Sequence, residues 1–196
     1  MSYTPTEREE PSMQTIMKPR ISLARVAMFA TLATLALVGS AAAQQPLPFH
    51  GAIQGEETAT FNTDHSIRTV DGRGTGRSTL PDLRRFTVRW GDTVIVATGR
   101  STGHLTFKAA NGDRIFTELI GYGEAIFPQP GPPTHIHIVE HNIITGGTGH
   151  FAGVTGSFTL DRVVDVSADP DPFSPGPFST SGSFHGTIIT SRGAED

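Results

Sequence analysis

The chain of 196 residues contains no cysteine. This absence excludes disulfide bridges, thiolate metal sites and cysteine nucleophiles, so a folded domain must be stabilised by its core alone. Convincing amphipathic helices are absent from residue 44 onward, where apolar and polar residues instead alternate between breaks at Gly, Pro and Asn. A closed β-sheet suits such a chain, because closure leaves no unpaired strand edges.

Clusters of positive charge are also missing from the sequence. The formal net charge is −4, and removing residues 1–43 removes four of the 15 basic and three of the 19 acidic residues, which leaves 11 and 16. From residue 44 onward Lys108 is the only lysine, and the other basic residues are arginines. With an acidic balance and no basic run, the sequence gives no indication of binding to nucleic acid or to anionic lipid.

The apolar run Val26–Val38 is too short to cross a bilayer, which takes roughly 20 residues. Basic residues precede it and a small-residue cleavage signal follows it: Lys18, Arg20 and Arg25, then Ala41, Ala42 and Ala43. This order predicts a secretory signal peptide over residues 17–43 that is cleaved before Gln44. We therefore expect export to the periplasm or the cell exterior, with an uncleaved membrane anchor as the alternative.

Residues 1–16 do not fit the signal peptide. The stretch Glu7–Glu10 is polar and mostly acidic, where a signal peptide begins with positive charge. We therefore expect translation to begin at Met17 or Met13, with the upstream stretch an over-long start. Residues 44–196 are then enough for a single domain.

Period-two alternation from residue 44 onward predicts an all-β domain of about eight strands. The expected strands are 51–61, 83–90, 92–98, 100–109, 114–127, 134–145, 155–167 and 181–190, and 62–77 is expected to be a loop with a short strand at its end. Asn111-Gly112 predicts a hairpin turn, and the proline-rich stretches 127–133 and 168–178 predict stiff loops. Eight short strands favour a closed antiparallel barrel that is filled by side chains or holds one small ligand. An open sandwich is the alternative.

Residues 143–158 form the most distinctive segment of the chain. They resemble the signature Thr-Gly-Gly-Thr/Ser-Gly-x-Phe-x-Gly-x-x-Gly of the allene oxide cyclase and dirigent β-barrel superfamily. The matching positions are Thr145, Gly146, Gly147, Thr148, Gly149, Phe151, Gly153 and Gly156. Other segments are similar to exported bacterial members and fall in the same order: 49–51, 106–113, 138–147 and 182–188. The resemblance covers most of the chain from residue 44 onward.

The glycines of this segment predict a tight turn rather than a phosphate loop. A phosphate loop needs a helix after it, whereas here a strand follows. Glycine lets the backbone turn sharply between two barrel strands, and we expect Phe151 to pack as a plug.

The resemblance implies an eight-stranded barrel of calycin-like shape, and it implies function less strongly. Members of the superfamily include cyclases that fold a reactive lipid epoxide, proteins that steer radical coupling, and barrels that close rings in natural-product synthesis. Their common feature is an apolar cavity that fixes the shape of a small hydrophobic molecule. The plant cyclases use a buried carboxylate on the first strand. Glu56 and Glu57 lie on the first strand here, but the surrounding plant motif is absent, so that role is not carried over.

One expected strand is rich in histidine. Period-two alternation places His135, His137 and His141 on one face of the strand, and Ile136, Ile138 and Glu140 on the other. Two imidazoles side by side, with a third ligand, could hold Zn²⁺, Cu²⁺ or Fe²⁺. The alternative is that the isoleucines face the apolar side and the histidines face water. We expect no bound cofactor unless this face holds zinc or copper.

Three functions are compatible with the sequence. The first is an exported barrel whose cavity binds a small hydrophobic molecule, and an enzyme of this kind would have an isomerase or cyclase-like activity. The second is an exported protein that binds metal through His135 and His137. The third is a barrel with a filled interior that acts as a structural or interaction domain. An open cavity separates the first function from the third. The ligand and the oligomeric state are not encoded in any recognisable motif.

Overall fold

The computed structural model describes residues 45–128, 130–169 and 171–190, and these form one closed antiparallel β-barrel of eight strands. The predicted over-long start and signal peptide lie outside the described residues. The strands are β1 (Leu47–Phe61), β2 (Ile67–Ser78), β3 (Arg85–Ile95), β4 (Arg100–Ala109), β5 (Arg114–Ile126), β6 (His135–Gly147), β7 (Thr155–Asp165) and β8 (Phe178–Ile189). The predicted all-β barrel is confirmed, and the open sandwich is excluded.

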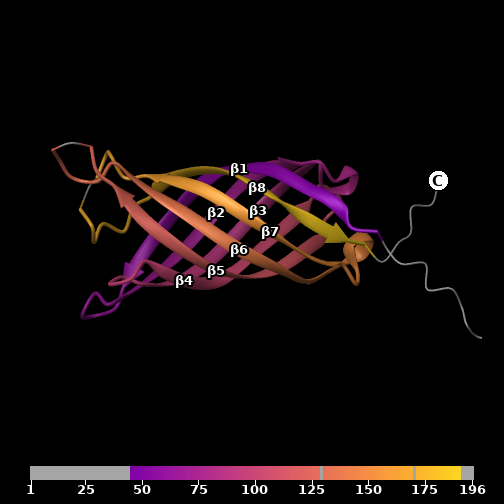
Figure 1. Cartoon of the computed structure of the whole chain (residues 1–196), viewed down its shortest axis with the longest axis horizontal. Helices are drawn as coiled ribbons and strands as arrows, with labels where there is room; N and C mark the ends of the chain where they lie inside the picture. The colour runs from indigo at the N-terminus through magenta and orange to yellow at the C-terminus, as the bar shows by residue number, and fades with distance from the viewer. Residues whose placement is uncertain (1–44, 129, 170, 191–196) are drawn as a thin grey trace, which may run out of the picture. The chain divides into compact units, whose positions relative to one another are not determined.

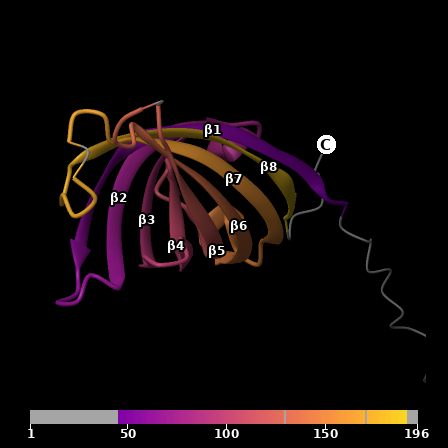
Figure 2. The same ribbon diagram turned by 60° about the vertical axis from the view of Figure 1, so that its left-hand side comes forward.

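Each strand pairs with its neighbour in sequence, and β1 also pairs with β8 (Figures 1 and 2). Leu47 lies opposite Ile188 in this seam, so the sheet has no free edge. Two short 3-10 turns, η1 (Pro81–Leu83) and η2 (Gly149–Phe151), are the only helical elements in the part of the chain described. None of the helices found there is long and apolar enough to span a bilayer.

Because consecutive strands run in opposite directions, their connections alternate between the two ends of the barrel. Loops 62–66, 96–99, 127–134 and 166–177 lie at one end, which we call the mouth. The connections 79–84, 110–113 and 148–154 lie at the other end, which we call the plug end. Both proline-rich stretches are therefore at the mouth, where Figure 1 shows them beyond the ends of β5 and β7.

The predicted boundaries were wrong in one region. Residues 67–78, expected to be mostly loop, form the long strand β2, and residues 85–95 form one strand, not two. The glycines of β2 point inward and make room for large neighbours. A Cβ on Gly72 would lie 1.9 Å from the Trp90 ring, and one on Gly76 would lie 2.4 Å from the Phe86 ring. Glycine here marks close packing inside a barrel, which the sequence alone does not distinguish from a loop.

The glycine signature forms the tight turn that was predicted at the plug end. Gly149 and Gly153 have φ of 57° and 74°, in the left-handed region that favours glycine. The turn between them brings Phe151, 1 % exposed, against the barrel core. The predicted role of Phe151 as a plug is therefore confirmed.

Aromatic side chains fill the plug half of the barrel. The rings of Phe49, Phe86, Phe158 and Phe184 surround Phe107, with centroids 5.1–6.1 Å from its own. Most of these contacts are edge-to-face or tilted, as aromatic pairs prefer. These rings occupy the interior of the plug half, so a ligand held inside the barrel would lie in the mouth half.

Candidate functional site

A cavity of about 490 Å³ opens in the mouth half of the barrel. Its walls are mainly apolar. The large apolar side chains that line it include Phe61, Val94, Ile136, Ile138 and Phe127. Phe127 and Pro172 bring the two proline-rich loops to the rim of the cavity. The volume is that of a pocket for a small organic molecule.

The cavity has a charged floor built around Arg162 of β7. The Arg162 guanidinium is 2 % exposed and bonds three carboxyl groups from three other strands. Its Nη1 donates to Glu57 Oε2 at 2.5 Å, and its Nε and Nη2 donate to Glu140 Oε1 at 3.1 and 2.8 Å. Nη2 also donates to Asp92 Oδ2 at 3.3 Å. All four side chains line the cavity.

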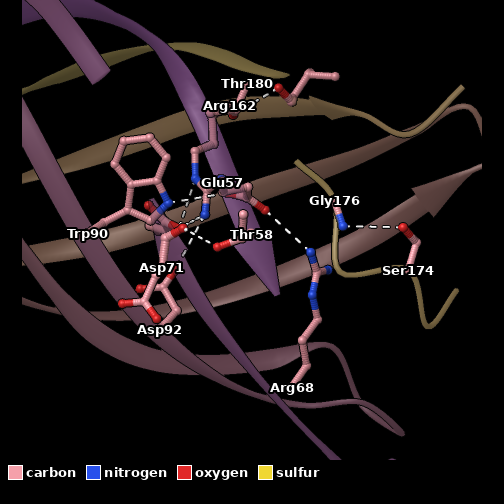
Figure 3. A network of polar contacts seen from close by, with 12 residues as sticks. Glu57, Thr58, Arg68, Asp71, Trp90, Asp92, Arg162, Ser174, Gly176 and Thr180 are labelled. Atoms are coloured by element: carbon pink, nitrogen blue, oxygen red, sulfur yellow. Dashed lines mark hydrogen bonds and ion pairs between the residues drawn. The ribbon is translucent and has the colours of Figure 1, made fainter. Parts of the chain in front are cut away.

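Glu57 of β1 is the most heavily bonded of the three carboxylates (Figure 3). Besides Arg162, it accepts a hydrogen bond from the Trp90 indole at 3.3 Å and one from Arg68 Nη2 at 3.4 Å. The Trp90 ring also lies under the Arg162 guanidinium, 5.6 Å from centroid to Cζ. These contacts fix Glu57 on the cavity floor with both carboxylate oxygens oriented.

Burial and the neighbouring carboxylates act in opposite directions on Arg162. Burial lowers the pKa of this guanidinium, but Glu140 and Glu57 outweigh burial, and the net pKa is raised. Arg162 is therefore a permanent cation at the centre of the site. A cation held this firmly can stabilise negative charge that develops on a bound molecule.

Asp92 is the one of the three carboxyl groups with a buried oxygen that has no hydrogen-bond partner. This oxygen is Oδ1. Burial, followed by the nearby Glu140 carboxylate, raises the pKa of Asp92 to about 8. The raised pKa favours the protonated form, and because Oδ2 already accepts from Arg162, the proton of that form would lie on Oδ1. Asp92 then offers a hydrogen-bond donor at the cavity wall.

Arg68 supplies a second unpaired donor. Its Nη2 reaches Glu57, while its Nε is buried and has no partner. A buried donor without an acceptor costs free energy that a ligand oxygen could recover. Two unsatisfied donors, Asp92 Oδ1 and Arg68 Nε, therefore border one apolar cavity. This arrangement suits a mainly apolar molecule that carries a hydrogen-bond-accepting oxygen.

The raised pKa of Asp92 gives a testable pH dependence. The folded protein holds a proton on Asp92 that the unfolded chain releases near pH 4, so folding is disfavoured progressively as pH rises from about 4 to 8. We expect Asp92→Asn to remove this dependence, and wild type to lose up to about 1.4 kcal/mol per pH unit relative to the variant within that window. Urea denaturation at several pH values measures the difference. Parallel curves for the two proteins across the window would contradict a proton on Asp92.

The three predicted metal residues lie on the outer wall of the barrel. His137 Nε2 is 2.9 Å from Asp161 Oδ1, His141 Nδ1 is 3.2 Å from Thr159 Oγ1, and His135 Nδ1 is 2.9 Å from the neighbouring Thr134 hydroxyl. In the described residues, no group of three or more His, Cys, Asp or Glu side chains is close enough to hold a metal ion. The zinc or copper site stays a prediction, and it has no connection to the cavity.

The sequence placed two of the site residues on their strands but assigned neither of them a role. It placed Glu57 on the first strand and put Glu140 on the same face as Ile136 and Ile138, which is the inward face. It did not identify Asp92 or Arg162. The available signal was a charged residue at an inward position of an alternating strand, where polar side chains need partners.

No family model, curated protein or solved structure matches this chain.

Proposed function

We propose that this chain is an exported β-barrel, of the allene oxide cyclase and dirigent type, whose cavity binds a small hydrophobic molecule and isomerises or cyclises it. The observation that carries the proposal is the pairing of an apolar cavity with a buried, hydrogen-bonded acid–base network. A cavity that only stored an apolar ligand would gain nothing from four buried ionisable groups, because burying charge is costly unless it is paired.

The chemistry requires no oxidant and no second substrate. Asp92 donates its Oδ1 proton, as a hydrogen bond, to an oxygen of the bound molecule. Arg162 and Arg68 offset the negative charge that forms there, and Glu57 accepts a proton from one carbon and returns it to another position of the same molecule, or holds the reacting conformer in place. An isomerisation or ring closure moves a proton or a bond within one molecule, so atoms and electrons balance without a cofactor. The apolar walls set the folded shape of the ligand and exclude water.

Ligand binding is tested by native mass spectrometry of the purified protein, followed by titration with an apolar fluorescent probe. We expect Val94→Trp to fill the cavity and to weaken probe binding at least tenfold. Thr93→Trp is the matched control, since the adjacent side chain points outward and the same bulk should leave binding unchanged. Equal probe binding by wild type and Val94→Trp would show that the cavity is not the binding site. A bare protein that binds no probe would favour a structural or interaction barrel.

A further inference from the structure

The outer wall of β2, β3 and β4 is basic, although no basic cluster is visible along the sequence. Alternation places six cations at outward positions of these strands: Arg73, Arg77, Arg85, Arg89, Arg100 and Lys108. Six threonines share the same positions: Thr69, Thr75, Thr87, Thr93, Thr102 and Thr106. Asp71 is the only carboxylate at the outward positions of these three strands. We call this surface the basic wall.

Strand register brings like charges together on this wall. Arg73 lies opposite Arg89, and Arg77 lies opposite Arg85, across the β2–β3 ladder. Lys108 on β4 faces Thr87 and so lies between the two pairs. Like charges directly opposite each other in a sheet are destabilising. Repulsion between these facing arginines therefore lowers the stability of the folded barrel. It arises from strand pairing and cannot be read from residues adjacent in the sequence.

The protein itself does not neutralise the six cations. Among the described residues, no carboxylate lies within ion-pair distance of any of them; the ion pairs of this region belong to Arg68 and Arg162 inside the barrel. Glu56 faces Arg73 across the β1–β2 ladder but forms no ion pair with it. The chain as a whole carries a net charge of −4, so a cationic face is a local asymmetry rather than a consequence of composition. Such a face attracts an anionic partner.

The residues between the cations indicate what kind of anion fits. The threonines supply hydroxyl groups in rows beside the guanidinium groups, and hydroxyls pair well with the hydroxyls of sugars. Ile67 and Ile95, which lie opposite each other in the β2–β3 ladder, are the only apolar side chains at these outward positions, so the wall has little to insert into a membrane. The His104 imidazole is the only aromatic ring at the outward positions of the three strands, so bases would find a single small ring to stack on.

The spacing of the charges favours a linear polymer. Arg73 and Arg77, like Arg85 and Arg89, are four residues apart on one strand, which is about 13 Å at 3.3 Å per residue. The wall is convex, because it is the outside of a barrel, so a flat anionic surface could touch only part of it. A flexible chain with a carboxylate or sulfate on each sugar can follow the curve and meet successive arginines.

We propose that the basic wall is a binding surface for a linear acidic polysaccharide, with carboxylated or sulfated sugars held by Arg73, Arg77, Arg85 and Arg89. This surface lies on the opposite side of the sheet from the cavity and does not depend on the proposed function. Binding at the wall would localise the barrel on an anionic matrix while the mouth stays open to small molecules.

The test is calorimetric titration of the purified protein with polygalacturonate at low ionic strength. We expect binding that weakens steeply with added salt, as counterions compete. The variant R73Q/R77Q/R85Q/R89Q should bind at least tenfold more weakly and show a shallower salt dependence. It should fold normally, because the substitutions remove facing like charges. Val94→Trp should bind polygalacturonate as wild type does, which separates this surface from the cavity.

A single matched pair keeps the test independent of the fourfold variant. Arg89→Gln, on the wall, should weaken binding severalfold, whereas Arg84→Gln, exposed beside η1, should not. The proposal is overturned if polygalacturonate does not bind, if uncharged dextran binds equally, or if the fourfold variant binds as tightly as wild type. It is also overturned if duplex DNA or anionic vesicles bind more tightly than the polysaccharide.

Discussion

Arg162→Met should destabilise the barrel by about 3–5 kcal/mol, because it leaves buried carboxylates without their cation. Arg162 donates to Glu57, Asp92 and Glu140 and is 2 % exposed. Methionine fills a similar volume but offers no charge and no donors. Urea denaturation at pH 7 measures the loss, and a variant that cannot be purified folded is the extreme of the same result.

Two further variants separate charge from packing at this position. Arg89→Met makes the same substitution on the outer wall, where we expect the free energy of unfolding to change by at most about 0.5 kcal/mol. Adding Glu140→Gln to Arg162→Met removes one of the stranded carboxylates and should restore part of the lost stability. If Arg162→Met lowered the free energy of unfolding by less than about 1 kcal/mol, pairing with Arg162 would not be what stabilises the buried carboxylates.

Phe107→Ala should cost about 3–5 kcal/mol, the usual range for removing a buried aromatic ring. Phe107 is fully buried and touches four other phenylalanine rings, so the void cannot be closed by small shifts. Thermal unfolding monitored by circular dichroism measures the effect.

Val94→Ala is the comparison for Phe107→Ala. Val94 borders the open cavity, so its truncation enlarges an existing space and should cost far less. Similar losses for the two variants, after allowing for side-chain size, would mean that the mouth half is as tightly packed as the plug half. The contrast therefore tests whether the barrel has one solid half and one hollow half.

Much of the fold was predictable because alternation is a local property. Buried apolar residues alternating along β7, the Asn111-Gly112 hairpin and the glycine signature each specify their own segment. Strand β2 was missed because three of its inward positions are Gly72, Gly74 and Gly76, which carry no hydrophobic signal. A side chain at Gly72 or Gly76 would meet the Trp90 or Phe86 ring on the next strand, which the sequence of β2 alone does not show.

The candidate site was less predictable because it depends on pairing between distant residues. Glu57 and Arg162 are 105 positions apart, and they meet only because β1 and β7 both flank β8. A charged residue at an inward position signals a buried partner but does not say which one. The basic wall was missed for the same reason, since Arg73 and Arg89 become neighbours only through strand register.

The seam between β1 and β8 has a consequence for how the chain folds. Seven of the eight strand pairings join consecutive strands and can form as local hairpins, but Leu47 must find Ile188 across 141 positions. Loop closure of this length is slow compared with hairpin formation. Until β8 arrives, β1 and β7 each present a bare hydrogen-bonding edge, and bare edges recruit other chains. The pairing of β8 with β1 therefore decides whether the chain closes into a barrel or aggregates, and loss of residues 178–189 should be fatal to solubility rather than merely destabilising.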